Sequence, residues 1–146
     1  MKRFSFRLEK LLKYREFREK EAETNLGKAN AARDALQIEL DSIALKRVRT
    51  AAERRQGLSA PELLAIEHYI NRLDTTKEQL LERLVLAEME VEKARKKYIT
   101  ATRERRVLSK LREKKSDEWK KYVTEEEAAV LDDISNFSDR NDQSST

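Results

Sequence analysis

The chain has 146 residues, of which 41% are charged and 38% hydrophobic, and its formal net charge is +4. It contains two glycines, one proline and no cysteine. This composition excludes a thick globular core, whereas long helices that share a narrow apolar seam need much less apolar surface. The lack of cysteine excludes disulfides and thiolate metal sites. No apolar run reaches the roughly 18 residues of a membrane span, and residues 1–20 lack the apolar core of a signal peptide, so we expect a soluble protein of the cell interior.

A first helical pattern begins near Phe4 or Ser5 and is expected to cover about residues 5–55. Arg15, Arg18 and Arg33 fall on its apolar face, where their aliphatic stems can pack while the guanidinium groups reach water. The apolar residues of this face are Leu8, Leu11, Ala22, Leu26, Ala29, Leu36, Leu40 and Ile43.

The strongest interruption of helical sequence is the segment QGLSAPE at residues 56–62. Gly57 suits the left-handed conformation that follows a helix end. Ser59 and Glu62 have the spacing of a capping box, with Pro61 tolerated in the first turn. These signals predict a turn at about 56–59 and a second helix from about residue 60.

The second helix carries a stripe of side chains every three or four residues from Leu63 to Tyr122. Of its eighteen positions, four are basic, namely Lys77, Arg105, Arg112 and Lys115. The other fourteen are apolar: Leu63, Ile66, Ile70, Leu73, Leu80, Leu84, Ala87, Val91, Ala94, Tyr98, Ala101, Leu108, Trp119 and Tyr122. Because the spacing averages 3.5 residues rather than 3.6, the stripe predicts a supercoiled partner helix.

Two helices joined by so short a turn should fold back on each other, which predicts an all-α fold, a long antiparallel two-helix coiled-coil hairpin. Residue numbers that face each other should sum to about 116, which sets Ala22 against Ala94 and Ala29 against Ala87. We expect one monomeric domain over residues 1–135, with the second helix ending near 134. The polar residues 135–146 have the composition of a disordered tail. Residues 124–134 either continue the second helix or restart from a Thr-x-x-Glu cap.

The end of the hairpin that carries both termini is rich in aromatic and basic residues. Residues 1–20 hold eight Lys or Arg against three Glu, and residues 103–121 hold nine against four acidic residues. The aromatic residues at this end are Phe4, Phe6, Tyr14, Phe17, Trp119, Tyr122 and Phe137, seven of the nine in the chain. They either thicken the seam or form a docking tip, and the basic runs are either a solvated helix face or a surface for an acidic partner. Nucleic acid is disfavoured because Glu and Asp are interleaved with the basic residues.

Residues for catalysis are missing from this sequence. His68 is the only histidine, without a cysteine or second histidine to share a metal, so a structural role is the simpler interpretation. There is no glycine-rich phosphate loop and no thiol nucleophile. We therefore expect no enzyme, no catalytic or metal site and no cofactor.

Three stretches of the chain resemble the FliJ family of flagellar export proteins. They are FSFRLEKLLKYREFREKEAE from Phe4, HYINRLDTTKEQL from His68, and VLSKLREKKSDEWKKYVTEEEAAVLDDIS ending at Ser135. Proteins of this family are antiparallel two-helix coiled coils similar to the γ-subunit stalk of rotary ATP synthases and to the stalk proteins of type III injectisomes. The resemblance therefore implies a non-enzymatic stalk or coupling protein of flagellar type III export, needed for flagellum biogenesis and motility.

The same resemblance implies partners and a location. The partners are the hexameric ring of the export ATPase FliI and the export gate protein FlhA, with export chaperones as further candidates and no nucleic acid. The implied role is to promote export of flagellar subunits. The implied location is the cytoplasm, peripherally associated with the cytoplasmic face of the inner membrane at the flagellar base, without direct membrane insertion.

Two sets of contact residues are expected. The positions that match the family's gate-binding surface are Tyr69, Leu73, Thr76 and Leu80, although Leu73 and Leu80 also lie on the apolar stripe and are alternatively buried packing residues. A stalk that enters a ring should present the end with both termini, so the expected ring contacts are Phe4, Phe6, Arg103, Arg105, Arg106, Lys110, Arg112, Lys114, Lys115, Trp119 and Tyr122. The remaining alternatives are a self-assembling coiled-coil scaffold and an injectisome-type stalk protein.

Overall fold

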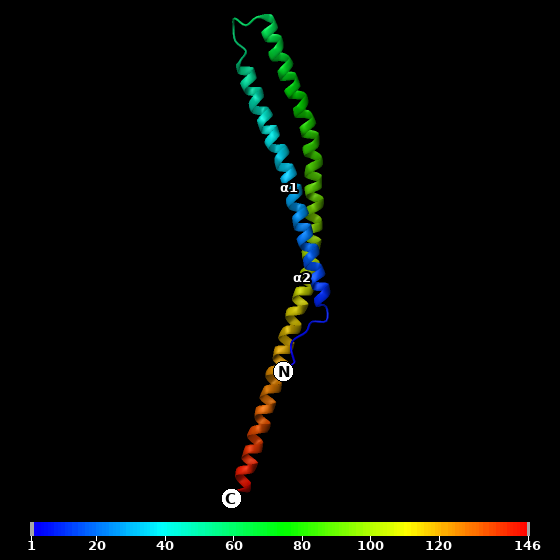
Figure 1. Ribbon diagram of the computed structural model, residues 1–146, viewed down its shortest axis with the longest axis vertical. Coiled ribbons are helices and arrows are strands. Elements are labelled where there is room, and N and C mark those ends of the chain that lie inside the picture. The colour runs from blue at the N-terminus through cyan, green and yellow to red at the C-terminus, as the bar shows by residue number, and fades with distance from the viewer. Residues whose placement is uncertain (1, 146) are drawn as a thin grey trace. The chain divides into compact units, whose positions relative to one another are not determined.

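A computed structural model describes residues 2–145, which form two α-helices and no strand: α1 (Glu9–Ala52) and α2 (Ala60–Ser144) (Figure 1). The two long helices pack against each other, which confirms the predicted helical hairpin. The chain forms two compact units, to which both helices contribute. We call Arg18–Ala101 the turn unit, and the residues up to Phe17 together with those from Thr102 onward the terminal unit.

Helix α1 begins at Glu9, later than the sequence predicted. Residues 2–6 have no regular structure, and the Glu9 amide donates a hydrogen bond to the Phe6 carbonyl (3.1 Å). The ring of Phe4 packs against Trp119 of α2, with 6.0 Å between the ring centroids. The N-terminal segment therefore contacts α2 through Phe4 and is not part of the α1 helix.

The connection between the helices covers residues 53–59, and in Figure 1 it runs on past the end of α1 before α2 begins. The capping box is confirmed, since the Ser59 amide donates to Glu62 Oε2 (3.0 Å) and the Glu62 amide to Ser59 Oγ (3.4 Å). Gly57 is left-handed, with φ of 95°. It lies five residues beyond the last residue of α1, Ala52, in the middle of the connection rather than directly at the helix end.

The apolar stripe of α2 forms the seam of the hairpin. Its buried members are Ile70, Leu73, Leu80, Val91, Ala101 and Leu108, and α1 contributes buried Leu12, Leu36, Leu40 and Ile43. In the turn unit the densest cluster consists of Leu36, Leu40, Ile43, Leu73 and Leu80, against which Tyr69, Leu84 and Ala87 pack. Of the four basic residues that interrupt the apolar stripe, three are exposed: Lys77, Arg112 and Lys115. The seam therefore follows the predicted periodicity and is filled within one chain.

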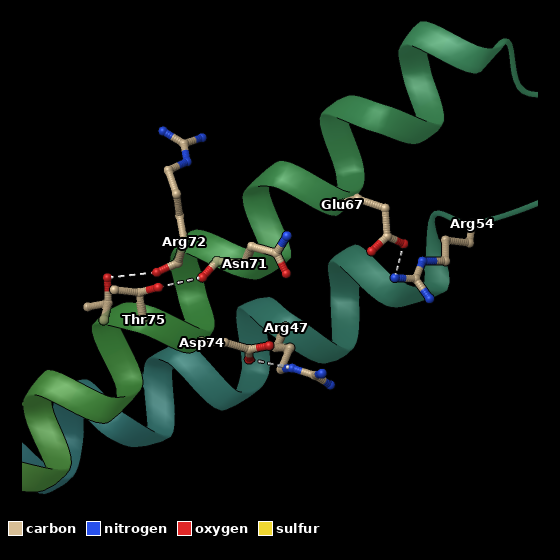
Figure 2. A network of polar contacts seen from close by, with 8 residues as sticks. Arg47, Arg54, Glu67, Asn71, Arg72, Asp74 and Thr75 are labelled. Carbon is tan, nitrogen blue, oxygen red and sulfur yellow. Dashed lines mark hydrogen bonds and ion pairs between the residues drawn. The ribbon is translucent and has the colours of Figure 1, made fainter.

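The register of the two helices differs from the prediction. In the turn unit, Arg47 Nε lies 2.8 Å from Asp74 Oδ1, and Arg54 forms an ion pair with Glu67 (Figure 2). The paired residue numbers sum to 121 in both cases, about one helical turn away from the expected 116. The longer connection explains the shift, because extended residues advance about 3.3 Å each, against about 1.5 Å in a helix, and carry the chain past the end of α1. Farther from the turn, Arg15 pairs with Glu104, and these numbers sum to 119. The expected pairing of Ala22 with Ala94 is therefore shifted by about three to five residues.

Helix α2 continues to Ser144, about ten residues beyond the predicted end, so residues 135–144 are helical rather than a disordered tail. No glycine or proline interrupts the segment. Thr124 does not cap a new helix, because its Oγ1 donates a hydrogen bond to the Lys120 carbonyl (2.9 Å) one turn earlier in the same helix. The last residue of the predicted tail, Thr146, lies outside the described residues.

Candidate docking surfaces

In the terminal unit, part of the predicted ring-contact set is used to hold the N-terminal segment. The guanidinium carbon of Arg112 lies 5.5 Å from the centroid of the Phe4 ring, and Arg112 Nε lies 2.8 Å from Glu9 Oε2. Phe4, Phe6 and Trp119 are half-buried. Glu9 neutralises part of the positive charge of Arg112. Three of the predicted contact residues therefore also stabilise the fold of the terminal unit: Phe4, Arg112 and Trp119.

The other predicted cations divide into paired and unpaired side chains. Lys115 Nζ lies 3.6 Å from Glu118 Oε2, and half-buried Arg105 donates to Ser109 Oγ (3.4 Å). Four exposed cations have no ion-pair partner among residues 2–145, and we call them the basic stripe: Arg103, Arg106, Lys110 and Lys114. Their spacing of three, four and four residues places them on one face of α2. This face lies on the opposite side of the helix from the seam.

The far end of the basic stripe is mixed in charge. A shallow groove on α2 is lined by Lys110, Glu113, Lys114, Asp117, Glu118 and Lys121. The carboxylates in this groove lower the positive potential around Lys110 and Lys114, because the fields of nearby opposite charges partly cancel. The positive field is therefore concentrated toward Arg103 and Arg106.

The structure also exposes aromatic side chains in this unit. Tyr122, which the sequence predicted as a contact residue, is 63% exposed. Tyr14 and Phe17 on α1 were not assigned to a contact surface, yet they are 52% and 65% exposed. The signal that could have assigned them was present, because both belong to the aromatic group at the end that carries the termini.

The four residues matched to the gate-binding surface separate by burial. Leu73 and Leu80 are only 8% and 3% exposed and belong to the core cluster of the turn unit. Half-buried Tyr69 packs against that cluster, with the Arg72 guanidinium carbon 5.6 Å from its ring centroid. Thr76 is exposed, and its Oγ1 donates to the Arg72 carbonyl (2.9 Å). A partner can therefore reach Tyr69 and Thr76 but not the two leucines.

In the turn unit, ion pairs join the charged flanks of the two helices. A hydrogen bond to Asp74, and then its negative charge, raise the pKa of Arg47 above its ordinary value. Both side chains are substantially exposed, so this pair contributes orientation and register more than stability.

Within residues 2–145 no group of three or more histidine, cysteine, aspartate or glutamate side chains could hold a metal ion. None of the described helices is long and apolar enough to cross a membrane.

These features define a class of protein. The described residues form a two-helix coiled-coil hairpin that fills its seam with its own side chains and displays charged and aromatic faces. The family model for the flagellar FliJ protein matches residues 4–144, nearly the whole chain, and the chain belongs to this family. It is therefore a component of the flagellar protein export apparatus. No curated protein and no solved structure matches the chain.

Proposed function

We propose that this chain is the stalk of the export apparatus, which binds the ring of the export ATPase FliI through its terminal unit and the export gate protein FlhA through its turn unit. In this role it promotes export of flagellar subunits from the cytoplasmic face of the inner membrane. The observation that carries the ring assignment is the basic stripe in the same unit as the exposed aromatic side chains of Tyr14, Phe17 and Tyr122.

The two kinds of side chain have different effects on binding. Four unpaired cations on one helix face attract an acidic or dipolar ring surface and mainly raise the association rate, in a salt-dependent way. Exposed aromatic side chains such as Tyr122 bury large areas on contact and mainly set the dissociation rate. Arg112 and Trp119 are poor test positions, because both hold the N-terminal segment through Phe4.

Association kinetics with purified FliI test the ring proposal. The triple variant Arg106→Glu, Lys110→Glu, Lys114→Glu should associate more slowly than the parent, with the difference shrinking at high salt. The matched control Lys28→Glu, Lys46→Glu, Arg49→Glu changes the net charge equally, through exposed cations of the turn unit. Tyr122→Ala should instead raise the dissociation rate. Equal slowing by both triple variants would reduce the effect to net charge and contradict the proposal.

For the gate we propose a contact through the accessible part of the matched surface, Tyr69 and Thr76. Thr76→Glu adds a charge at an exposed position and leaves the core cluster intact. It should weaken binding to the cytoplasmic domain of FlhA and reduce motility, at unchanged helix content. Ser42→Glu on an exposed position of α1 is the control. Unchanged FlhA binding by the Thr76 variant would remove the gate assignment from this surface.

A self-assembling scaffold is not favoured. Assembly through the apolar stripe would need seam positions that are free to pair between chains. Within the turn unit, Leu36, Leu40 and Ile43 already pack against Leu73 and Leu80 of the same chain.

A further inference from the structure

The last part of α2 is a helix without a neighbour. Every residue from Thr124 to Ser145 is exposed. Four large apolar side chains lie in this segment: Val130 (51% exposed), Leu131 (66%), Ile134 (60%) and Phe137 (67%). Exposed apolar residues gathered on a helix without a neighbour are a candidate contact surface.

The apolar residues of this segment other than Leu131 share one side of the helix. Val123, Val130, Ile134 and Phe137 recur at intervals of seven, four and three residues, which places them on one face. Trp119, four residues before Val123, stands at the start of the same face. We call Val123, Val130, Ile134 and Phe137 the C-terminal face. It continues the direction of the α2 seam into a region where a second helix could pack in the same way.

Helix α1 does not supply that second helix. Its first residue, Glu9, pairs with Arg112 of α2, and the segment before it reaches Trp119 through Phe4. Val123 is half-buried, but from Thr124 to Ser145 every residue is exposed, so the described part of the chain leaves Val130, Ile134 and Phe137 uncovered. The occupant must therefore come from outside this hairpin.

The charges around the C-terminal face select the occupant. Residues 123–144 hold seven acidic side chains, Glu125, Glu126, Glu127, Asp132, Asp133, Asp139 and Asp142, against the single base Arg140. The same segment of a second copy, or an anionic lipid surface, would meet like charge. We propose that the C-terminal face binds an amphipathic helix of another protein whose apolar side is flanked by lysine and arginine.

The stability of the segment supports a partner. Acidic residues near a helix C-terminus interact unfavourably with the helix dipole, and the last turn of α2 contains no basic residue. Most helical stability in proteins comes from tertiary packing, which residues 124–144 lack. Residues 124–144 are therefore the part of α2 that opens most readily, and a bound basic helix would protect their amides from hydrogen exchange.

The test uses the full chain and a synthetic probe, so it requires neither FliI nor FlhA. The probe is a labelled 20-residue amphipathic helix with leucine on one face and lysine on the other, and the control probe carries glutamate in place of lysine. Fluorescence anisotropy should show binding of the lysine probe only. Hydrogen exchange of residues 124–144 should slow when it binds, with no comparable change in the turn unit. Equal binding of both probes, or protection only elsewhere, would overturn the proposal.

Two triple variants separate the C-terminal face from general stickiness. Val130→Ser, Ile134→Ser, Phe137→Ser keeps every charge, and should weaken lysine-probe binding at least about tenfold, as loss of interface anchors usually does. The matched control Ile38→Ser, Leu45→Ser, Val48→Ser removes equally exposed apolar residues of α1 and should bind as the parent does. Parental binding by the first variant would overturn the proposal by reducing the contact to charge alone. The proposal would also be overturned if sedimentation showed that the free chain is a dimer and that this variant is a monomer, because the occupant would then be a second copy.

Discussion

Replacing Leu80 by alanine tests whether Leu80 is a buried packing residue of the seam rather than a surface contact for a partner. Leu80 is 3% exposed and lies in the core cluster, whereas Leu86 on the same helix is 62% exposed. The two substitutions remove the same atoms from the same helix. Any difference in the free energy of unfolding therefore reports burial and packing.

The expected magnitudes follow from the two environments. Truncation of a buried leucine costs roughly 2–5 kcal/mol, and the lower part of that range applies here because a two-helix seam borders on solvent and can partly close over the gap. We therefore expect about 2–3 kcal/mol for Leu80→Ala. Leu86→Ala removes little packing and slightly improves helix propensity, so it should stay within about 0.5 kcal/mol of the parent.

Urea unfolding followed by circular dichroism at 222 nm measures both values, provided that the slopes agree. A cost of less than about 1 kcal/mol for Leu80→Ala, or equal costs for the two variants, would refute the assignment of Leu80 to the core. If the prediction holds, weaker FlhA binding by Leu80→Ala would report loss of folded protein rather than a lost contact.

Two more local predictions concern backbone and register. Gly57→Ala should destabilise by about 1 kcal/mol, because alanine resists a φ of 95° even where its methyl group meets open space, whereas Gly27→Ala within α1 should stabilise by about 0.5–1 kcal/mol in the same urea titration. A cysteine pair at Ala29 and Val91 should oxidise faster within one chain than a pair at Ala29 and Ala87. The reverse order would restore the register that sums to about 116.

The features that the sequence predicted correctly are those with local causes. The seam follows from a 3.5-residue period, and the cap from Ser59 and Glu62 at the required spacing. Register has no such local cause, because it depends on the path of residues 53–59. The helical conformation of residues 135–144 was missed because their polar composition suits a disordered tail.

The candidate sites were harder to predict, because pairing and burial arise only in the folded chain. Composition shows a basic segment, but not that Arg112 contacts Glu9 and Phe4 while Arg106 remains unpaired. The resemblance suggested Leu73 as a gate contact, whereas the apolar stripe already placed it in the seam. The folded structure supports the stripe.

The central claim is that the terminal unit is the surface that meets the export ATPase. Site-specific photo-crosslinking tests it most directly, with p-benzoylphenylalanine placed singly at Tyr122 and, as a control of similar exposure, at Leu45 in the turn unit. After irradiation with purified FliI, the account predicts a crosslinked product from position 122 and none from position 45. Crosslinking from position 45 without any from position 122 would contradict it.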